Sequence, residues 1–284
     1  MSDRSYREYQ TVIAQMVSDK GIRQAAASVH NSDRFRWDAK RRRWLATPCP
    51  GCTVITPPFL EETANVATYA RLGDIQQALV QGAGATVLAP VPVSSFHLTV
   101  ADLVWGDTYL RQNDLPGYEG RLIAAITDVF QHNGRLADEA IPALLRGVTA
   151  FVSGIVAVVD FPNETDYVRL CALRAAIYED KRLQALGVYP TGPFTGHITL
   201  AYVSGLKGEE DRERLADTLT ALNREYFEQP IPFSLVRAEF RRFADMSAYH
   251  RAPDWPIFHF TCNTQHERSP HAQHSHCITD VHRS

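Results

Sequence analysis

The chain has 284 residues, of which 45% are hydrophobic and 21% are charged, a composition typical of a soluble protein with a sizeable core. Its net charge of −3 excludes the strongly basic character of a dedicated DNA-binding protein, although a small anionic ligand needs only a local positive site. The sequence has no segment as apolar as a membrane span and no signal-peptide core near its N-terminus, so we expect a cytoplasmic monomer with no DNA or membrane partner.

Residues 1–50 form the first predicted unit, a helical and basic N-terminal extension. Residues 5–20 carry apolar side chains at the spacing of one helix face. Residues 30–48 are polar and include the basic run KRRR at 40–43. Such a run can contact a phosphate chain, but it is more often a solvated loop, and we favour the loop.

The main domain begins near residue 51, and its first half mixes strands and helices. Apolar or β-branched runs bounded by Pro or Gly predict strands, and apolar residues at 3.6-residue spacing predict helices. The elements expected here are a strand at 52–56, a helix at 68–81, strands at 86–88 and 96–103, and a helix at 120–132. The mixed segment 105–120 is long enough for a lid or substrate loop, and Arg111 is its one cation.

The second half repeats this order. Its expected elements are a strand at 150–160, a helix at 164–180, a strand at 196–203, a helix at 209–227 and a strand at 233–243. The recurring order predicts a single α+β domain over residues 51–262, with two similar lobes at about 51–148 and 149–262. An exchange of strands between the lobes is left open, and the cleft between them is the expected site.

Each half carries the pattern His-x-Thr in a strand between its two helices, as FHLTV and then as GHITLAY. Because residues i and i+2 share one face of a strand, His97 and Thr99 point to the same side, and so do His197 and Thr199. A single such pair is ordinarily a hydrogen-bonded core histidine beside a strand-favouring threonine. Two copies at corresponding places indicate a shared functional role.

Two histidines that face a common anion suit in-line phosphoryl transfer. One imidazole takes a proton from the attacking hydroxyl or water, and the other gives a proton to the departing oxygen, because histidine titrates near neutrality. The hydroxyls of Thr99 and Thr199 can donate hydrogen bonds to the non-bridging phosphate oxygens. This chemistry needs no metal or other cofactor, and we expect no third ligand such as Asp or Glu on these strands to complete a zinc site.

The paired motifs resemble those of the two-histidine (2H) phosphoesterase superfamily, which includes the LigT-like RNA 2′-5′ ligases and the cyclic nucleotide phosphodiesterases. The phrases PVSSFHLTV and FRRFADM are most similar to a bacterial branch of it, and the resemblance covers roughly residues 51–245. It implies a bilobal fold with two antiparallel sheets around a central cleft, and metal-independent phosphodiester chemistry. It carries over to His97 and His197 as catalytic residues and to Thr99 and Thr199 as phosphate-binding residues.

We therefore predict a hydrolase that opens a cyclic (2′,3′-cyclic or related) or 2′-5′ phosphodiester of a small nucleotide or an RNA end. The substrate within this class stays open, as does the choice of histidine for acid and for base. A non-catalytic nucleotide or RNA sensor that uses the same cleft is the alternative. RNA ligation is a weaker variant, because the sequence contains neither a P-loop nor a nucleotidyl-transfer lysine motif.

Five further residues are candidates for substrate binding. Phe96 and Tyr202 flank the motifs and could stack on a base, although aromatic residues beside a strand are more often core residues. Arg111, Arg241 and Arg242 could reach a phosphate, with a solvated edge as the alternative for the last two.

Two further sequence features could suggest metal binding. Cys49-Pro-Gly-Cys52 is interpreted as a turn that enters a strand, because a zinc site needs a second ligand pair and a redox CxxC is expected at a helix start. Residues 263–284 hold five of the eleven histidines and lack apolar periodicity, which predicts a disordered tail. A metal-dependent hydrolase that uses these cysteines or histidines is the rival hypothesis.

Overall fold

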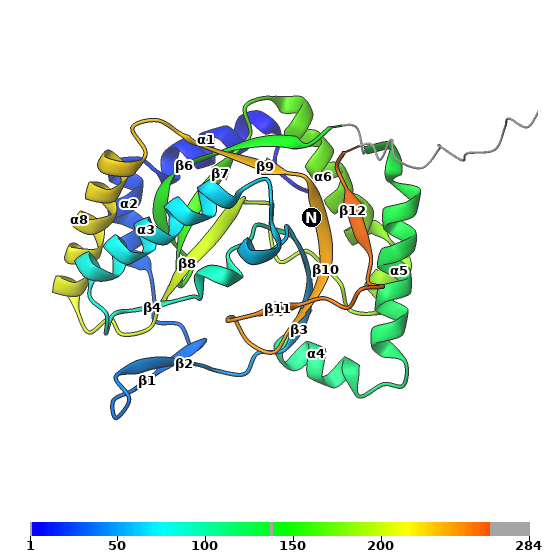
Figure 1. Cartoon of the computed structure of the whole chain (residues 1–284), viewed down its shortest axis with the longest axis horizontal. Helices are drawn as coiled ribbons and strands as arrows, with labels where there is room; N and C mark the ends of the chain where they lie inside the picture. Colours follow the sequence, from blue (N-terminus) through cyan, green and yellow to red (C-terminus); the bar gives the residue numbers. More distant parts are fainter. Residues whose placement is uncertain (1, 137–138, 262–284) are drawn as a thin grey trace, which may run out of the picture.

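Two five-stranded antiparallel sheets form the centre of the molecule in the computed structural model, which describes residues 2–136 and 139–261 (Figure 1). The first sheet has the order β11-β10-β3-β5, with β12 also paired to β10, and comprises β3 (Gly51–Ile55), β5 (Thr99–Trp105), β10 (Arg237–Phe243), β11 (Tyr249–His250) and β12 (Ile257–His259). The second sheet has the order β4-β8-β7-β6-β9 and comprises β4 (Leu88–Pro90), β6 (Ile141–Phe151), β7 (Gly154–Asp160), β8 (His197–Val203) and β9 (Ile231–Leu235). The predicted α+β class with antiparallel sheets is confirmed.

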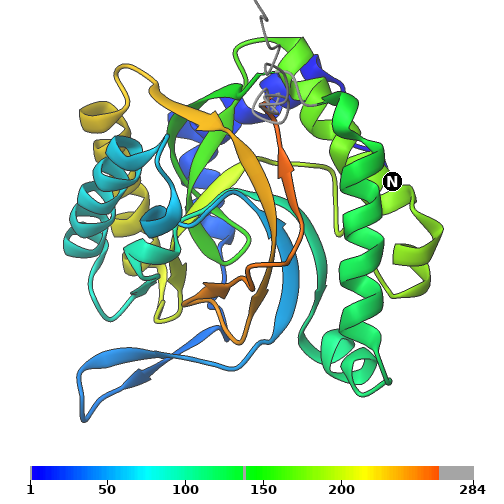
Figure 2. The same ribbon diagram turned by 45° about the vertical axis from the view of Figure 1, so that its right-hand side comes forward.

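Helices cover both sheets (Figures 1 and 2). The helices are α1 (Tyr6–Met16), α2 (Asp19–Ser28), α3 (Val66–Ala83), α4 (Gly106–Asn113), α5 (Tyr118–His132), α6 (Glu164–Glu179), α7 (Lys181–Ala185) and α8 (Glu209–Tyr226), with short 3₁₀ turns η1 (Phe59–Glu61), η2 (Val93–Ser95) and η3 (Gly134–Leu136). α2, α3 and α8 pack together over the second sheet, whereas α4, α5 and α6 contact strands of the first sheet. Among the helices that the structure describes, none is long and apolar enough to cross a membrane.

Each sheet contains elements from both halves of the chain. β4, from the first half, pairs with β8 in the second sheet, and α3 packs beside it. β10, from the second half, pairs with β3 in the first sheet. The predicted division between residues 148 and 149 falls within β6. The two sheets are therefore built jointly, and their shared core runs through the centre of the fold.

The predicted single strand at 150–160 is wrong, because this segment contains the end of β6, a turn and all of β7. The turn lies at Val152, whose φ of 57° is in the left-handed region, and at Ser153. All seven residues of β7 are buried. A strand buried on both faces has no alternation of polar and apolar residues, so the apolar run hides the turn before it.

The predicted single strand at 233–243 is also wrong. It is two strands, β9 and β10, separated by Val236, and they belong to different sheets. β9 alternates in burial, whereas four consecutive residues of β10 are buried, so the alternating sequence does not reveal the break between them. This crossing carries the chain from the second sheet to the first.

The segment 105–120 is helical rather than a loop, since it forms α4 and the start of α5. Tyr109 and Tyr118 anchor it in the core, and the hydroxyl of Tyr118 donates to the carbonyl of Leu186 at 2.8 Å. The basic run at 40–43 forms the tip of a two-stranded hairpin, β1 (Phe35–Asp38) and β2 (Arg43–Ala46). The tail predicted at 263–284 lies outside the described residues.

The N-terminal helices are part of the core. The predicted helix at 5–20 is two helices, and α1 begins with a capping box in which Ser5 and Glu8 exchange hydrogen bonds. The apolar faces of α1 and α2 are buried against the second sheet. Asp3 forms a nearly buried ion pair with Arg174 of α6 at 2.8 Å, which ties the start of the chain to α6.

We expect Ile13→Ala to lower the free energy of unfolding by about 2–5 kcal/mol, because Ile13 is 2% exposed and its removal leaves a cavity. Gln15→Ala, on the exposed face of the same helix, should change it by no more than about 0.5 kcal/mol. Urea denaturation of the two variants makes the comparison. Equal stabilities would show that α1 does not pack on the core.

Candidate active site

A pocket of about 370 Å³ lies where the two sheets meet. Both His-x-Thr motifs line it, one at the start of β5 and the other at the start of β8. The structure therefore brings together His97, Thr99, His197 and Thr199, which are 100 residues apart in pairs. Residues of the loop between β6 and β7 and of the segment before β11 complete the walls.

A single antiparallel bridge between Leu98 and Ile198 joins the two motif segments. Both bridge residues are fully buried on the core side. In antiparallel register, this bridge sets His97 across from Thr199 and Thr99 across from His197, with all four on the other face. Each histidine is thus beside the threonine of the opposite motif, and the four side chains surround one point.

The two imidazoles are held in the same way. Nδ1 of His97 lies 2.7 Å from the carbonyl oxygen of Ser95, and Nδ1 of His197 lies 2.8 Å from that of Thr195. A carbonyl oxygen only accepts, so each Nδ1 carries its proton and donates. In the neutral ring, this tautomer leaves Nε2 as an acceptor for a group in the pocket.

A β-bulge follows each motif at the same position. The register shifts between Val54 and Ile55 in the first sheet, and between Ile155 and Val156 in the second. The extra residue reverses the alternation of side chains, so the next residue to line the pocket is three positions after the threonine. That residue is Asp102.

The equivalent residue after the second motif is Tyr202, which also lines the pocket. The two halves therefore match at the histidine, at the threonine and at this third position, where they differ in charge. The expectation that no Asp or Glu lies on these strands is wrong, since Asp102 is on β5. The simple alternation of a regular strand would have turned it toward the core, and nothing in the sequence marks the bulge.

Burial controls the charge of these groups. Burial, together with the neighbouring His197 and Arg241, lowers the pKa of His97 to about 4. Burial also lowers the pKa of His197, but there the carboxylate of Asp102 acts in the opposite direction. Burial raises the pKa of Asp102, with His197 and Arg174 opposing. The two histidines are alike in geometry and different in electrostatic environment.

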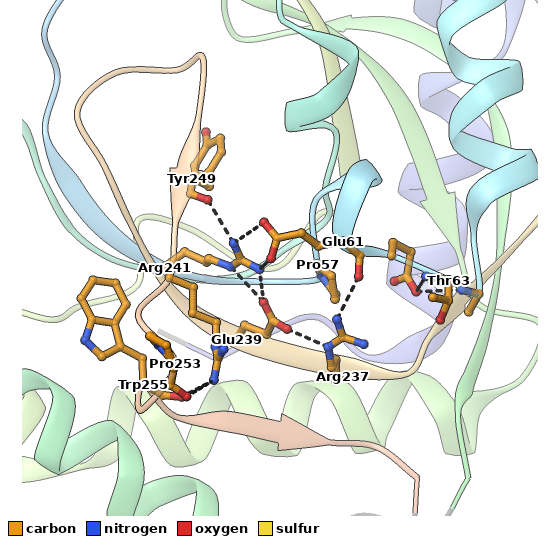
Figure 3. A network of polar contacts seen from close by, with 12 residues as sticks. Pro57, Glu61, Thr63, Arg237, Glu239, Arg241, Tyr249, Pro253 and Trp255 are labelled. Atoms are coloured by element: carbon orange, nitrogen blue, oxygen red, sulfur yellow. Dashed lines mark hydrogen bonds and ion pairs between the residues drawn. The ribbon is translucent and has the colours of Figure 1, made fainter.

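The ring of His97 is supported from behind. It packs edge-on against Tyr249, with ring centroids 4.2 Å apart. The guanidinium of Arg241 donates to the carbonyl oxygen of Tyr249 at 3.1 Å. It also forms a bidentate ion pair with Glu61 and hydrogen bonds with Glu239 (Figure 3). This buried network fixes the backbone that carries Tyr249. His197 packs against Phe151 at 5.1 Å.

Of the five predicted substrate-binding residues, only Tyr202 lines the pocket. Phe96 is 1% exposed and belongs to the core. Arg241 forms ion pairs with Glu61 and Glu239 (Figure 3), and Arg242 forms an ion pair with Glu119 of α5 at 3.2 Å. Arg111 lies on α4, where it bonds to Thr108. The structure does not bring these four to the pocket.

The cation at the pocket is Arg34, which the sequence reasoning missed. It lines the pocket, and its guanidinium lies 5.0 Å from the ring centroid of Trp105, another lining residue. Arg34 precedes the hairpin, more than 60 residues before the first motif. No local pattern linked it to the motif strands.

The cysteines that the structure describes show no metal-binding arrangement. Cys49 and Cys52 are buried, Cys52 at the start of β3, and burial raises the pKa of the Cys52 thiol to about 12. The guanidinium of Arg34 donates to Sγ of Cys49 at 2.8 Å. Within residues 2–136 and 139–261, no three His, Cys, Asp or Glu side chains group closely enough to hold a metal ion. Cys262 and the histidine-rich tail lie outside the described residues.

The comparisons with known families agree with the motif. The family model 2H-phosphodiest, described as a domain of unknown function (DUF1868), matches residues 36–114, which include the first motif. The predicted relationship to the 2H phosphoesterase superfamily is confirmed over this segment. No curated protein matches the chain in sequence.

One of the similar solved structures supports the fold. A conserved protein of unknown function from Agrobacterium tumefaciens, ATU0111, is 19% identical, with 85% of this chain and 99% of that chain covered and a TM-score of 0.54. LigT from E. coli in its apo form is 12% identical, with 76% and 100% covered and a TM-score of 0.37. LigT complexed with 3′-AMP is 13% identical, with 71% and 93% covered and a TM-score of 0.37. At such identities, the likeness to ATU0111 concerns the fold alone.

Proposed function

We propose that this protein is a metal-independent phosphodiesterase that hydrolyses a cyclic (2′,3′-cyclic or related) or 2′-5′ phosphodiester of a nucleotide or an RNA end. One observation carries the proposal. Two histidines, each oriented by an Nδ1 hydrogen bond to the carbonyl two residues before it, lie across from each other's threonine in one pocket. A core role for either histidine does not account for this duplication.

The proposed reaction is an in-line displacement at phosphorus. Nε2 of the neutral His97 takes a proton from water as the water oxygen bonds to phosphorus. The bond from phosphorus to the departing ribose oxygen breaks, and that oxygen receives the Nε2 proton of a protonated His197. The hydroxyls of Thr99 and Thr199 donate to the non-bridging oxygens, whose negative charge grows in the transition state.

The surroundings of the two rings support this assignment of acid and base. His97 feels the positive charge of Arg241, which favours the neutral ring that a base needs. His197 feels the carboxylate of Asp102, which favours the protonated ring that an acid needs. The bound phosphodiester adds a further negative charge beside His197. Asp102 is thus a positioning residue, whose carboxylate favours the protonated form of His197.

Removing either histidine should abolish most of the activity. His97→Ala and His197→Ala should each lower kcat on 2′,3′-cyclic nucleotides by a factor on the order of 10²–10⁴, in EDTA, because each removes one proton transfer. His132→Ala, an exposed histidine on α5, should leave kcat unchanged. Product analysis by chromatography measures all four proteins.

Full activity in both histidine variants would contradict the mechanism. Loss of wild-type activity in EDTA would favour the metal-dependent alternative. Tight binding of cyclic nucleotides by calorimetry with no product at any enzyme concentration would favour the sensor.

The pH profile should report the role of Asp102. Burial lowers the pKa of His197 below its ordinary value, so kcat/KM should fall as the pH rises through the pKa of His197 and the acid loses its proton. Asp102→Asn removes the charge that keeps His197 protonated, so this basic limb should move to lower pH. The acidic limb, set by His97 near pH 4, should stay.

Asp107→Asn makes the same charge change at an exposed position on α4 and should leave both limbs in place. A shift of the acidic limb alone in Asp102→Asn would reverse the assignment of acid and base.

A further inference from the structure

The hairpin β1–β2 is a strongly basic arm that projects from the body of the protein (Figures 1 and 2). Residues 34–43 contain six Lys or Arg and one Asp, in a chain whose net charge is −3. At its tip, Lys40, Arg41, Arg42 and Arg43 are all exposed. Among the ion pairs of the described residues, only Arg41 of these four takes part, with Asp38 at 2.9 Å.

The tip has a defined shape. The carboxylate of Asp38 accepts from the backbone N–H groups of Lys40 and Arg41, at 3.0 and 3.1 Å. Beside the tip, Nε1 of Trp44, the second residue of β2, donates to the carbonyl of Ala85 at 2.9 Å and fastens the arm to the body. The cations are therefore displayed on an ordered turn, which reduces the entropy lost when they bind a ligand.

One face of the arm is aromatic. Trp37 and Trp44 are cross-strand partners with ring centroids 5.2 Å apart, and neither is fully buried. On the same face, Phe35 packs against Tyr202 at 5.7 Å, and Tyr202 lines the pocket. A row of aromatic rings thus leads from the pocket wall along the arm.

The series of cations along the arm also starts at the pocket. Arg34 lines it beside Trp105, which is 41% exposed. From Arg34, strand geometry carries the chain to Lys40 over about 20 Å. A single nucleotide in the pocket does not span that distance, so the tip is placed for a longer ligand. Cations interleaved with partly exposed aromatic rings such as Trp37, Trp44 and Trp105 suit single-stranded nucleic acid, because phosphates pair with the cations and bases stack on the rings.

We propose that the hairpin, residues 34–46, binds the single-stranded RNA that leads up to the phosphodiester in the pocket. The inference rests on the proposed function for the identity of that end, and it makes a polynucleotide end, rather than a free nucleotide, the preferred substrate. An anionic lipid surface would use the same cations, but it does not require their continuity with the pocket through Arg34 and Tyr202.

The test compares two substrates that share a reacting group, cyclic 2′,3′-AMP and a single-stranded oligoribonucleotide ending in a 2′,3′-cyclic phosphate. The tip variant changes Lys40, Arg41, Arg42 and Arg43 to Gln. The matched control changes four exposed cations elsewhere, Arg7, Lys20, Arg121 and Lys207, to Gln. At low salt, the tip variant should lose kcat/KM on the oligonucleotide by a factor on the order of 10 or more, and the control should not.

Both variants should hydrolyse cyclic 2′,3′-AMP at the wild-type rate. In the wild type, kcat/KM for the oligonucleotide should fall with rising salt, and the tip variant should flatten that slope, because fewer counterions are released on binding. Trp37→Ala should weaken the oligonucleotide alone, through lost stacking. Equal effects of the tip and control variants, or equal effects on both substrates, would overturn the inference while leaving the phosphodiesterase intact.

If the wild type turns over neither substrate, the proposed function fails and the hairpin is tested by binding. Fluorescence anisotropy with a plain oligoribonucleotide should then show a Kd raised on the order of 10-fold in the tip variant only. Unchanged affinity overturns the inference. Tip-dependent sedimentation with phosphatidylserine vesicles, without any tip effect on the oligonucleotide, assigns the arm to a lipid surface and overturns it as well.

Discussion

The antiparallel bridge between Leu98 and Ile198 is the contact on which the site depends. It fixes the register of two segments that are 100 residues apart, and a slip by one residue would turn every polar side chain of one motif toward the core. The exchange of elements between the sheets holds this register. β4, which precedes the first motif in the chain, pairs with β8, and the pairing extends to a hydrogen bond from the N–H of Val91 to the carbonyl of Leu200. Neither half can shift without breaking the sheet of the other.

A duplicated frame then carries different chemistry at matching positions. The histidines, their carbonyl partners, the threonines and the bulges repeat, whereas Asp102 and Tyr202 do not. The ion pairs of the buried Arg241 with Glu61 and Glu239 lie on the side of His97 alone. A symmetric site would leave the direction of proton transfer undefined. In the proposed mechanism, the unequal charges provide one, with no change in the backbone that holds the rings.

Much of this arrangement could be read from the sequence, and the reasons for the failures are physical. The two motifs were found because strand alternation is local, and it placed His97 with Thr99 and His197 with Thr199. Asp102 was missed because a bulge is set by pairing with β3, which no local pattern reports. The run at 150–160 concealed a turn because β7 is buried on both faces. Arg241 was expected at the substrate and Arg34 was missed, because only the fold decides which cation meets a carboxylate and which meets the pocket.

The central claim is that both imidazoles and both threonines meet one phosphate. A crystal structure with inorganic phosphate tests this claim most directly. The account predicts one ion within hydrogen-bond distance, about 2.7–3.2 Å, of Nε2 of His97 and His197 and of the hydroxyls of Thr99 and Thr199. Both Nδ1 atoms should keep their bonds to Ser95 and Thr195. Phosphate bound elsewhere, or in contact with only one of the two motifs, would contradict the account.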